Sequence, residues 1–73
     1  MPSLGDQIVA LFKAGKIPNP MCTADIHRRF AGKYSDKYIN VVLANFEVTT
    51  GDYVKKGQKP LFRRVSEGRY VAI

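Results

Sequence analysis

The last thirteen residues of the chain constrain its fold most strongly, because they form two short β-prone runs around a turn. Leu61–Val65 and Arg69–Ile73 flank Ser66-Glu67-Gly68, and Gly68 supplies the positive φ that a tight hairpin turn needs. The pattern predicts a β-hairpin at this end of the sequence. Apolar residues fall on both alternating faces of the first run, so we expect a bulge or an edge position to reconcile them.

Arginines make this predicted hairpin cationic. We expect Arg63, Arg64 and Arg69 to point partly outward. Two interpretations stay open: the arginines contact a polyanion, or they only keep an edge strand from pairing with other chains. The residues expected to pack against the first and third helices are Phe62, Val65 and Tyr70.

A first helix is predicted over Leu4–Ala14. Ser3, followed three residues later by Asp6, resembles a capping box, and apolar residues then recur at helical spacing. Gly15 suits the left-handed position that ends many helices. The helix is therefore expected to end at about this glycine.

Prolines separate the first helix from a second one. The residues before Pro18 and Pro20 cannot be helical, so residues 17–20 should be extended, with a short edge strand at Lys16–Ile17. Thr23 is expected to cap a second helix that ends near Ala31-Gly32. The core face of this helix should comprise Ile26, Phe30 and either Met21 or Cys22.

A third helix is predicted over Asp36–Glu47, after a turn at Lys33-Tyr34 and with Ser35 as its cap. Its core face spans about 100° of the helix and comprises Ile39, Val42, Leu43 and Phe46. The opposite face carries Lys37, Asn40, Val41 and Ala44. Small and hydrogen-bonding residues let a helix enter a DNA major groove, although an ordinary solvent-facing side has a similar composition.

The segment between Val48 and Pro60 is predicted to be a long loop, with a short strand at Tyr53-Val54. It contains Lys55, Lys56 and Lys59, so its tip is suited to follow a phosphate backbone. A mobile, solvated loop is the other interpretation.

Charge is unevenly distributed along the chain. In residues 1–27, Lys13 and Lys16 are matched by Asp6 and Asp25, so the whole net charge of +6 lies in residues 28–73. A localised basic excess on a small domain favours a polyanionic partner, most often nucleic acid.

Catalytic patterns are missing. His27 is the only histidine and Cys22 the only cysteine, which excludes an intramolecular disulfide and a cysteine-rich zinc site. The two glycine-rich phosphate-binding motifs, GxxxxGK[ST] and GxGxxG, do not occur in the sequence. Asp6, Asp25 and Asp36 lie near predicted helix starts, where a carboxylate complements the helix dipole. We therefore expect no enzyme, no metal and no cofactor.

The chain is short enough that residues 1–73 should form a single domain, and its apolar fraction of 45% is that of a folded protein. The apolar stretch near the N-terminus is too short and too interrupted to span a membrane or to act as a signal sequence. A cytoplasmic, nucleoid-associated protein in a reducing compartment is expected.

Helix, linker, helix, turn, helix, loop and hairpin is the order of winged helix-turn-helix domains. The ending from Phe62 to Ile73 resembles the F-x-R-V-x-x-G-x-Y-x-L ending of HARE-type domains and of winged-helix modules of bacterial restriction and modification systems. Cys22–Ile26 is similar to their second-helix opening, and Ser35–Phe46 occupies their third helix. The resemblance implies DNA contact through helix three, the wing and the flanking loops; for some members it implies protein docking. The third helix here lacks the arginine that often reads guanine.

The sequence thus predicts an α+β winged helix-turn-helix domain, three helices with a C-terminal wing, that binds double-stranded DNA as a monomer or weak dimer. It would serve as a targeting module in restriction-modification or transcription regulation, on its own or tethered to a larger chain. Alternatives are a protein-interaction module that uses Tyr38 and Val41, and RNA binding with Tyr34, Tyr53 or Tyr70 stacked on bases. The residues predicted to contact DNA are Arg28, Arg29, Lys33, Ser35, Lys37, Asn40, Val41, Ala44, Lys55, Lys56, Arg63, Arg64 and Arg69.

Overall fold

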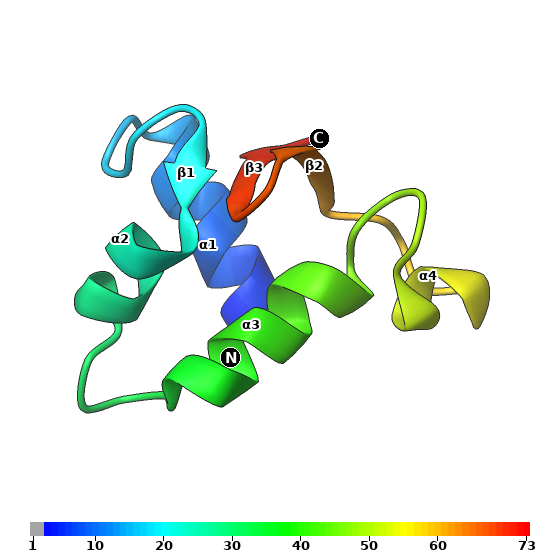
Figure 1. Ribbon diagram of the computed structural model, residues 1–73, viewed down its shortest axis with the longest axis horizontal. Coiled ribbons are helices and arrows are strands. Elements are labelled where there is room, and N and C mark those ends of the chain that lie inside the picture. The colour runs from blue at the N-terminus through cyan, green and yellow to red at the C-terminus, as the bar shows by residue number, and fades with distance from the viewer. Residues whose placement is uncertain (1–2) are drawn as a thin grey trace.

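The structure is a computed structural model that describes residues 3–73. These residues form an α+β domain of four helices and one antiparallel sheet with strand order β1-β3-β2. In Figure 1, α3 crosses the lower front of the molecule, α1 lies behind it, the sheet lies above, and α4 is set apart at one end. In chain order the elements are α1 (Leu4–Lys13), β1 (Met21–Cys22), α2 (Thr23–Arg29), α3 (Asp36–Asn45), α4 (Asp52–Lys55), β2 (Phe62–Ser66) and β3 (Arg69–Ala72).

Helix α1 begins at Leu4 as its sequence predicts and ends at Lys13, one residue before the predicted end. The Ser3 side chain accepts a hydrogen bond from the Asp6 amide at 3.2 Å, which satisfies one of the free N–H groups of the first turn. At the other end Gly15 has a φ of 73°, and the Lys16 amide donates to the Leu11 carbonyl at 2.9 Å. This pair of features is a Schellman motif, which stops the helix and reverses the chain.

The edge strand predicted at Lys16–Ile17 is wrong; the strand is Met21–Cys22, which pairs with the start of β3. Lys16 cannot pair with a strand through its amide, because that amide closes the end of α1. The predicted cap Thr23 is also wrong: Cys22 is the N-cap and makes no side-chain capping bond. The amide of Thr23 instead donates to the Gly68 carbonyl of the hairpin turn at 3.2 Å.

The ends of α2 and α3 also come earlier than predicted. Helix α2 ends at Arg29, because the chain turns at Phe30, whose carbonyl accepts from the Lys33 amide at 2.9 Å. Helix α3 starts as predicted, with the Ser35 hydroxyl accepting from the Tyr38 amide at 3.1 Å. It ends at Asn45 rather than Glu47, because the chain leaves the helix there to bridge to β2.

The hydrophobic core lies between α1, α2, α3 and the inner face of the sheet. Phe62 and Tyr70 bring the hairpin into this core, as predicted, at 0% and 9% exposure. The prediction for Val65 is wrong: its side chain is 49% exposed, because the strand register shifts between Arg64 and Ser66 and leaves Val65 in a bulge. The buried apolar residues are Leu4, Ile8, Ile17, Met21, Ile26, Phe30, Ile39, Val42, Leu43, Phe62 and Tyr70.

The segment predicted to be a loop with a strand at Tyr53-Val54 contains the short helix α4 instead. The Tyr53 ring packs edge-to-face on Phe46, with ring centroids 5.1 Å apart. Gly51 starts this helix, and its amide donates to the Glu47 carbonyl at 2.9 Å. None of the helices described in residues 3–73 combines the length and the apolar composition that spanning a bilayer requires.

Gly51→Ala is expected to lower the free energy of unfolding by roughly 1–3 kcal/mol, the cost of overpacking a tight site. A Cβ at Gly51 would lie 2.3 Å from the Asn45 carbonyl oxygen, which belongs to the backbone and cannot rotate away. Gly5→Ala is the matched control: its Cβ would meet the Leu61 side chain at 2.7 Å, which can move, and alanine favours the helix. Urea unfolding of both variants tests this, and equal losses would contradict it.

Candidate nucleic-acid interface

The outer side of α3 carries small and hydrogen-bonding side chains. The four residues predicted to face solvent are all exposed: Lys37, Asn40, Val41 and Ala44. The opposite side of the helix buries Ile39, Val42 and Leu43 against the rest of the domain. The predicted exposure is therefore confirmed, and contact of this face with DNA stays a prediction.

One residue of this face is already bonded within the domain. The Asn40 Oδ1 atom accepts a hydrogen bond from His27 Nε2 at 2.8 Å, which links α3 to α2. His27 Nδ1 lies 3.8 Å from an oxygen of Asp36, at the start of α3. The sequence predicts a half-buried or solvated His27, but the two bonded residues are thirteen positions apart, so no local pattern reveals their contact.

The cations of α2 and of the turn after it are exposed, but they differ in their surroundings. Arg28 forms an ion pair with Asp25, one turn earlier in the helix. Arg29 and Lys33 line a cavity that α2 forms with α1. The Ser35 side chain is exposed and is used as the cap of α3.

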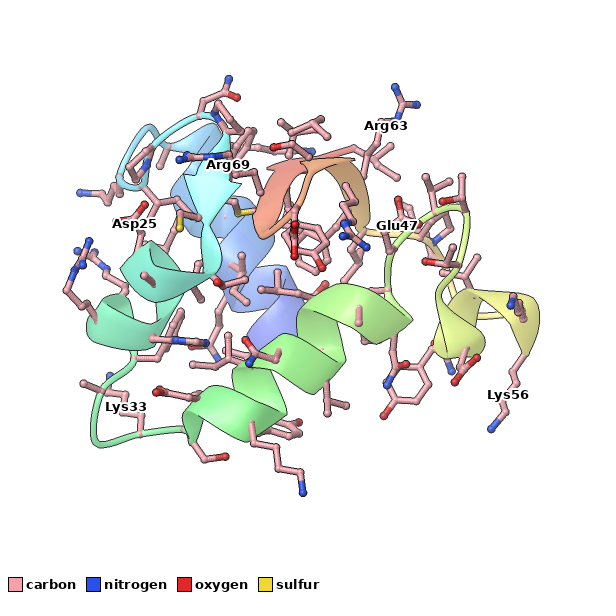
Figure 2. The ribbon with its side chains drawn as sticks, viewed as in Figure 1. Asp25, Lys33, Glu47, Lys56, Arg63 and Arg69 are labelled. Atoms are coloured by element: carbon pink, nitrogen blue, oxygen red, sulfur yellow. The ribbon has the colours of Figure 1, made fainter. Side chains whose placement is uncertain are left out.

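The remaining predicted cations lie on α4 and on the hairpin. Lys55 and Lys56 are exposed at the end of α4, and Lys56 lies at the end of the molecule opposite α2 (Figure 2). Arg63, Arg64 and Arg69 are exposed on the two strands of the hairpin. The domain is 29 Å along its longest axis, so these cations are spread over separate segments rather than gathered at one point.

The hairpin tip is tied to the start of α2. Cys22 pairs with Arg69 in the sheet, and the turn residue Gly68 has a φ of 71° and accepts the Thr23 amide. Arg69 consequently lies beside β1, whereas Arg63 lies farther along the hairpin and points away from it (Figure 2). The position of the hairpin relative to α2 and α3 is therefore set by backbone hydrogen bonds.

Glu47 holds the other end of the hairpin. Its side chain is 3% exposed and lies between the end of α3 and β2. The oxygen Oε1 accepts bonds from the amides of Thr49 and Thr50, at 2.7 and 2.9 Å, and from both threonine hydroxyls. The oxygen Oε2 accepts from the amide of Arg64 at 2.9 Å. One carboxylate thus joins α3, the turn after it and the arginine-bearing strand.

These hydrogen bonds keep the Glu47 carboxyl ionised. Burial alone would raise its pKa, but the bonds from Thr49, Arg64 and Thr50 outweigh burial and lower the pKa from 4.5 to about 2. Sequence reasoning missed this residue, because it placed Glu47 at the end of the third helix and gave its side chain no partner. The two threonines that follow it were the available signal, since adjacent hydroxyls and amides can surround a carboxylate.

The tyrosines considered for stacking on RNA bases are engaged in the fold. Tyr70 is 9% exposed, so the prediction that it stacks on a base is wrong. Tyr34 stacks on Tyr38, with ring centroids 5.7 Å apart, and Tyr53 packs on Phe46. Aromatic packing inside the domain therefore uses ring surface that base stacking would need.

Neither a metal cluster nor a known relative guides the functional assignment. In residues 3–73, no group of three or more His, Cys, Asp or Glu side chains is placed to hold a metal ion. No family model, no curated protein and no solved structure matches the chain. The assignment must therefore come from the exposed residues of α3, α4 and the hairpin themselves.

Proposed function

We propose that the chain is a winged helix-turn-helix domain that binds double-stranded DNA, with β2 and β3 as its wing. The order of elements supports this proposal: α2 and α3 follow each other after a turn, and an antiparallel hairpin comes last. The strongest support is the exposed face of α3, which is free of bulky acidic groups. Segments rich in lysine and arginine precede and follow this helix in the sequence.

In this proposal α3 lies in the major groove. Lys37 is near the first turn, where it reaches a phosphate or a guanine edge, and Val41 and Ala44 contact thymine methyl groups. The small side chain of Ala44 lets the helix axis approach the floor of the groove. The face offers few hydrogen-bonding groups to the bases, so we expect modest sequence preference.

Asn40 is the proposed base reader. A bidentate contact with adenine uses the amide oxygen as an acceptor and the amide nitrogen as a donor. His27 occupies one acceptor site of that oxygen, and an amide oxygen has two. α2 thus holds Asn40 through one lone pair of its oxygen, and the amide nitrogen and the second lone pair of this exposed residue remain for a base.

Five exposed cations are proposed to neutralise phosphates: Lys55, Lys56, Arg63, Arg64 and Arg69. Arg28 is left out because it is paired with Asp25, and Arg29 and Lys33 because they line the cavity beside α1. About five phosphate contacts predict that log affinity falls with log salt concentration with a slope near −4.5.

Two variants separate phosphate contacts from base reading. Lys55→Ala with Lys56→Ala is expected to weaken binding to all duplexes alike, by about 0.9 decade per lysine at 0.1 M salt, and to flatten the salt slope by about 1.8. Asn40→Ala is expected to weaken preferred sites by about 1–3 kcal/mol and to leave random duplexes unchanged. Fluorescence anisotropy with labelled duplexes at several salt concentrations measures both.

Lys13→Ala is the control for these variants, because Lys13 is an exposed cation at the end of α1, outside the proposed contacts. It should shift affinity little at any salt concentration. If neither the lysine pair nor Asn40→Ala changes affinity, the proposed function fails.

A second candidate function is protein docking through α3. The observation in its favour is that Tyr38 and Val41 are 47% and 37% exposed on this helix. An affinity for a protein that is insensitive to salt, together with no retention of DNA at low salt, would support docking instead.

A further inference from the structure

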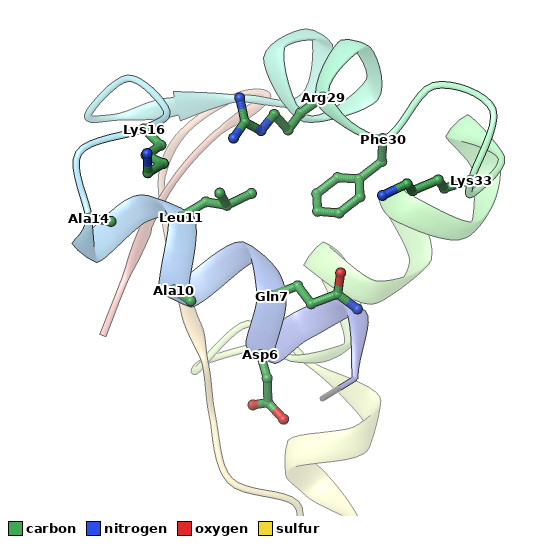
Figure 3. A pocket seen from close by; sticks show the side chains of 9 residues that line it. All are labelled: Asp6, Gln7, Ala10, Leu11, Ala14, Lys16, Arg29, Phe30 and Lys33. Carbon is green, nitrogen blue, oxygen red and sulfur yellow. The ribbon is translucent and has the colours of Figure 1, made fainter. Parts of the chain in front are cut away.

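A cavity of about 500 Å³ lies between α1 and the end of α2 (Figure 3). Small-molecule sites typically have volumes of about 300–1,000 Å³, with mostly apolar walls and a few polar groups. This cavity follows that pattern. The residues that line it are Asp6, Gln7, Ala10, Leu11, Ala14, Lys16, Arg29, Phe30 and Lys33.

The floor of the cavity is apolar and its rim is cationic. Leu11 and Phe30 lie at its centre, and the cations Lys16, Arg29 and Lys33 surround them from three sides (Figure 3). In the described part of the chain, none of these three cations has a carboxylate within ion-pairing distance. The rim therefore carries positive charge that the domain itself does not neutralise.

The one acidic group at the cavity does not compensate this charge. Asp6 accepts a hydrogen bond from the Ser3 hydroxyl at 3.0 Å, and its carboxylate points away from the three cations (Figure 3). A ligand with an acidic head group would thus meet an unopposed positive rim. A ligand with a cationic head group would be repelled from the same place.

We propose that this cavity binds a small molecule with an apolar body and one carboxylate. The apolar body would cover Leu11 and Phe30, where burial removes hydrocarbon from water. The carboxylate would pair with Arg29, whose guanidinium makes two parallel hydrogen bonds to such a group, and with Lys16 or Lys33. Charge complementarity between head group and rim selects this class of ligand over alcohols and amines.

This site is separate from the proposed DNA contacts. None of its described lining residues belongs to α3, α4 or the hairpin. The apolar side of α3 is turned inward, so the face proposed for DNA points away from the core that α1 shares. Loss of either function therefore leaves the other measurable.

The test is an NMR chemical-shift titration of the full chain with hexanoate, octanoate and decanoate. We expect affinity to rise about fourfold for each methylene added, because each one buries further hydrocarbon. Amide shifts should concentrate at Ala10, Leu11 and Phe30. Octylamine and octanol are the matched probes without an acidic head, and either one binding as tightly as octanoate would overturn the proposal.

Two variants test which residue binds the carboxylate of the ligand. Arg29→Gln is expected to weaken octanoate at least about tenfold, since it removes a charge-assisted hydrogen bond. Lys13→Gln removes an exposed cation of α1 that does not line the cavity, and it should leave octanoate binding unchanged. Equal effects of the two variants on octanoate binding would contradict the assignment of Arg29. A tetrapeptide of two leucines flanked by aspartates that bound more tightly than octanoate would also contradict the proposal, because the cavity would then be a peptide-docking site.

Discussion

Glu47→Gln is expected to lower the free energy of unfolding by about 3 kcal/mol at neutral pH. The carboxyl has a pKa of about 2 in the folded chain against 4.5 as its ordinary value, and each pKa unit corresponds to about 1.4 kcal/mol. Glutamine replaces one acceptor oxygen by an NH₂ group that faces donors, so bonds are lost and a donor is left without a partner. A domain of 73 residues has about 4–11 kcal/mol of stability in total, so this loss is large.

The stabilisation of the fold by Glu47 should decrease as the pH is lowered. Because folding lowers its pKa, the stabilisation is fully present above pH 4.5 and disappears as the pH falls toward 2. Urea unfolding curves followed by circular dichroism at several pH values measure this. The difference between the natural chain and Glu47→Gln should shrink steadily below pH 4.5, and a difference of the same size at pH 3 and pH 7 would contradict the argument.

Glu67→Gln is the matched control for that experiment. Glu67 lies in the hairpin turn and is exposed, so its replacement should change stability by less than about 0.5 kcal/mol. Glu47 also matters for the proposed function. Its carboxylate accepts a hydrogen bond from the Arg64 amide and so positions the first strand of the proposed wing. A destabilised Glu47 variant that is still folded at low temperature should bind DNA with a weaker salt dependence.

Replacing Arg63, Arg64 and Arg69 together by alanine is expected to weaken binding to every duplex by on the order of 10²-fold or more at 0.1 M salt. Each arginine that contacts a phosphate contributes about 0.9 to the salt slope, so the slope should fall from about −4.5 to about −1.8. All three side chains are exposed, and the bond to Glu47 uses the backbone of Arg64, so the fold should survive.

The effect of net charge on DNA affinity must be separated from the effect of direct contact by the hairpin arginines. A variant with Lys13, Lys16 and Arg29 changed to alanine removes the same charge from α1 and the cavity side. It should reduce DNA affinity much less, because long-range attraction is screened beyond about 10 Å at 0.1 M salt. Equal losses in both triple variants would show that the hairpin is not a specific contact surface.

Local sequence patterns predicted the parts of the fold that depend on neighbouring residues. Ser3 and Ser35 cap the helices that follow them, and Gly15 and Gly68 adopt the positive φ values that their positions require. The exposed and buried sides of α3 were also predictable, because helical spacing assigns each side chain to one face. Each of these features is decided within about one helical turn or one hairpin turn.

Local sequence patterns are enough to place the starts of α1 and α3, the apolar side of each core helix and the turn of the hairpin. Long-range packing places β1 at Met21–Cys22, leaves Val65 outside the core and lets Glu47 join α3 to β2. It also decided that His27 holds Asn40 and that a cationic rim surrounds a cavity beside α1. These features are contacts between residues far apart in the chain, so their partners are known only once the core has packed.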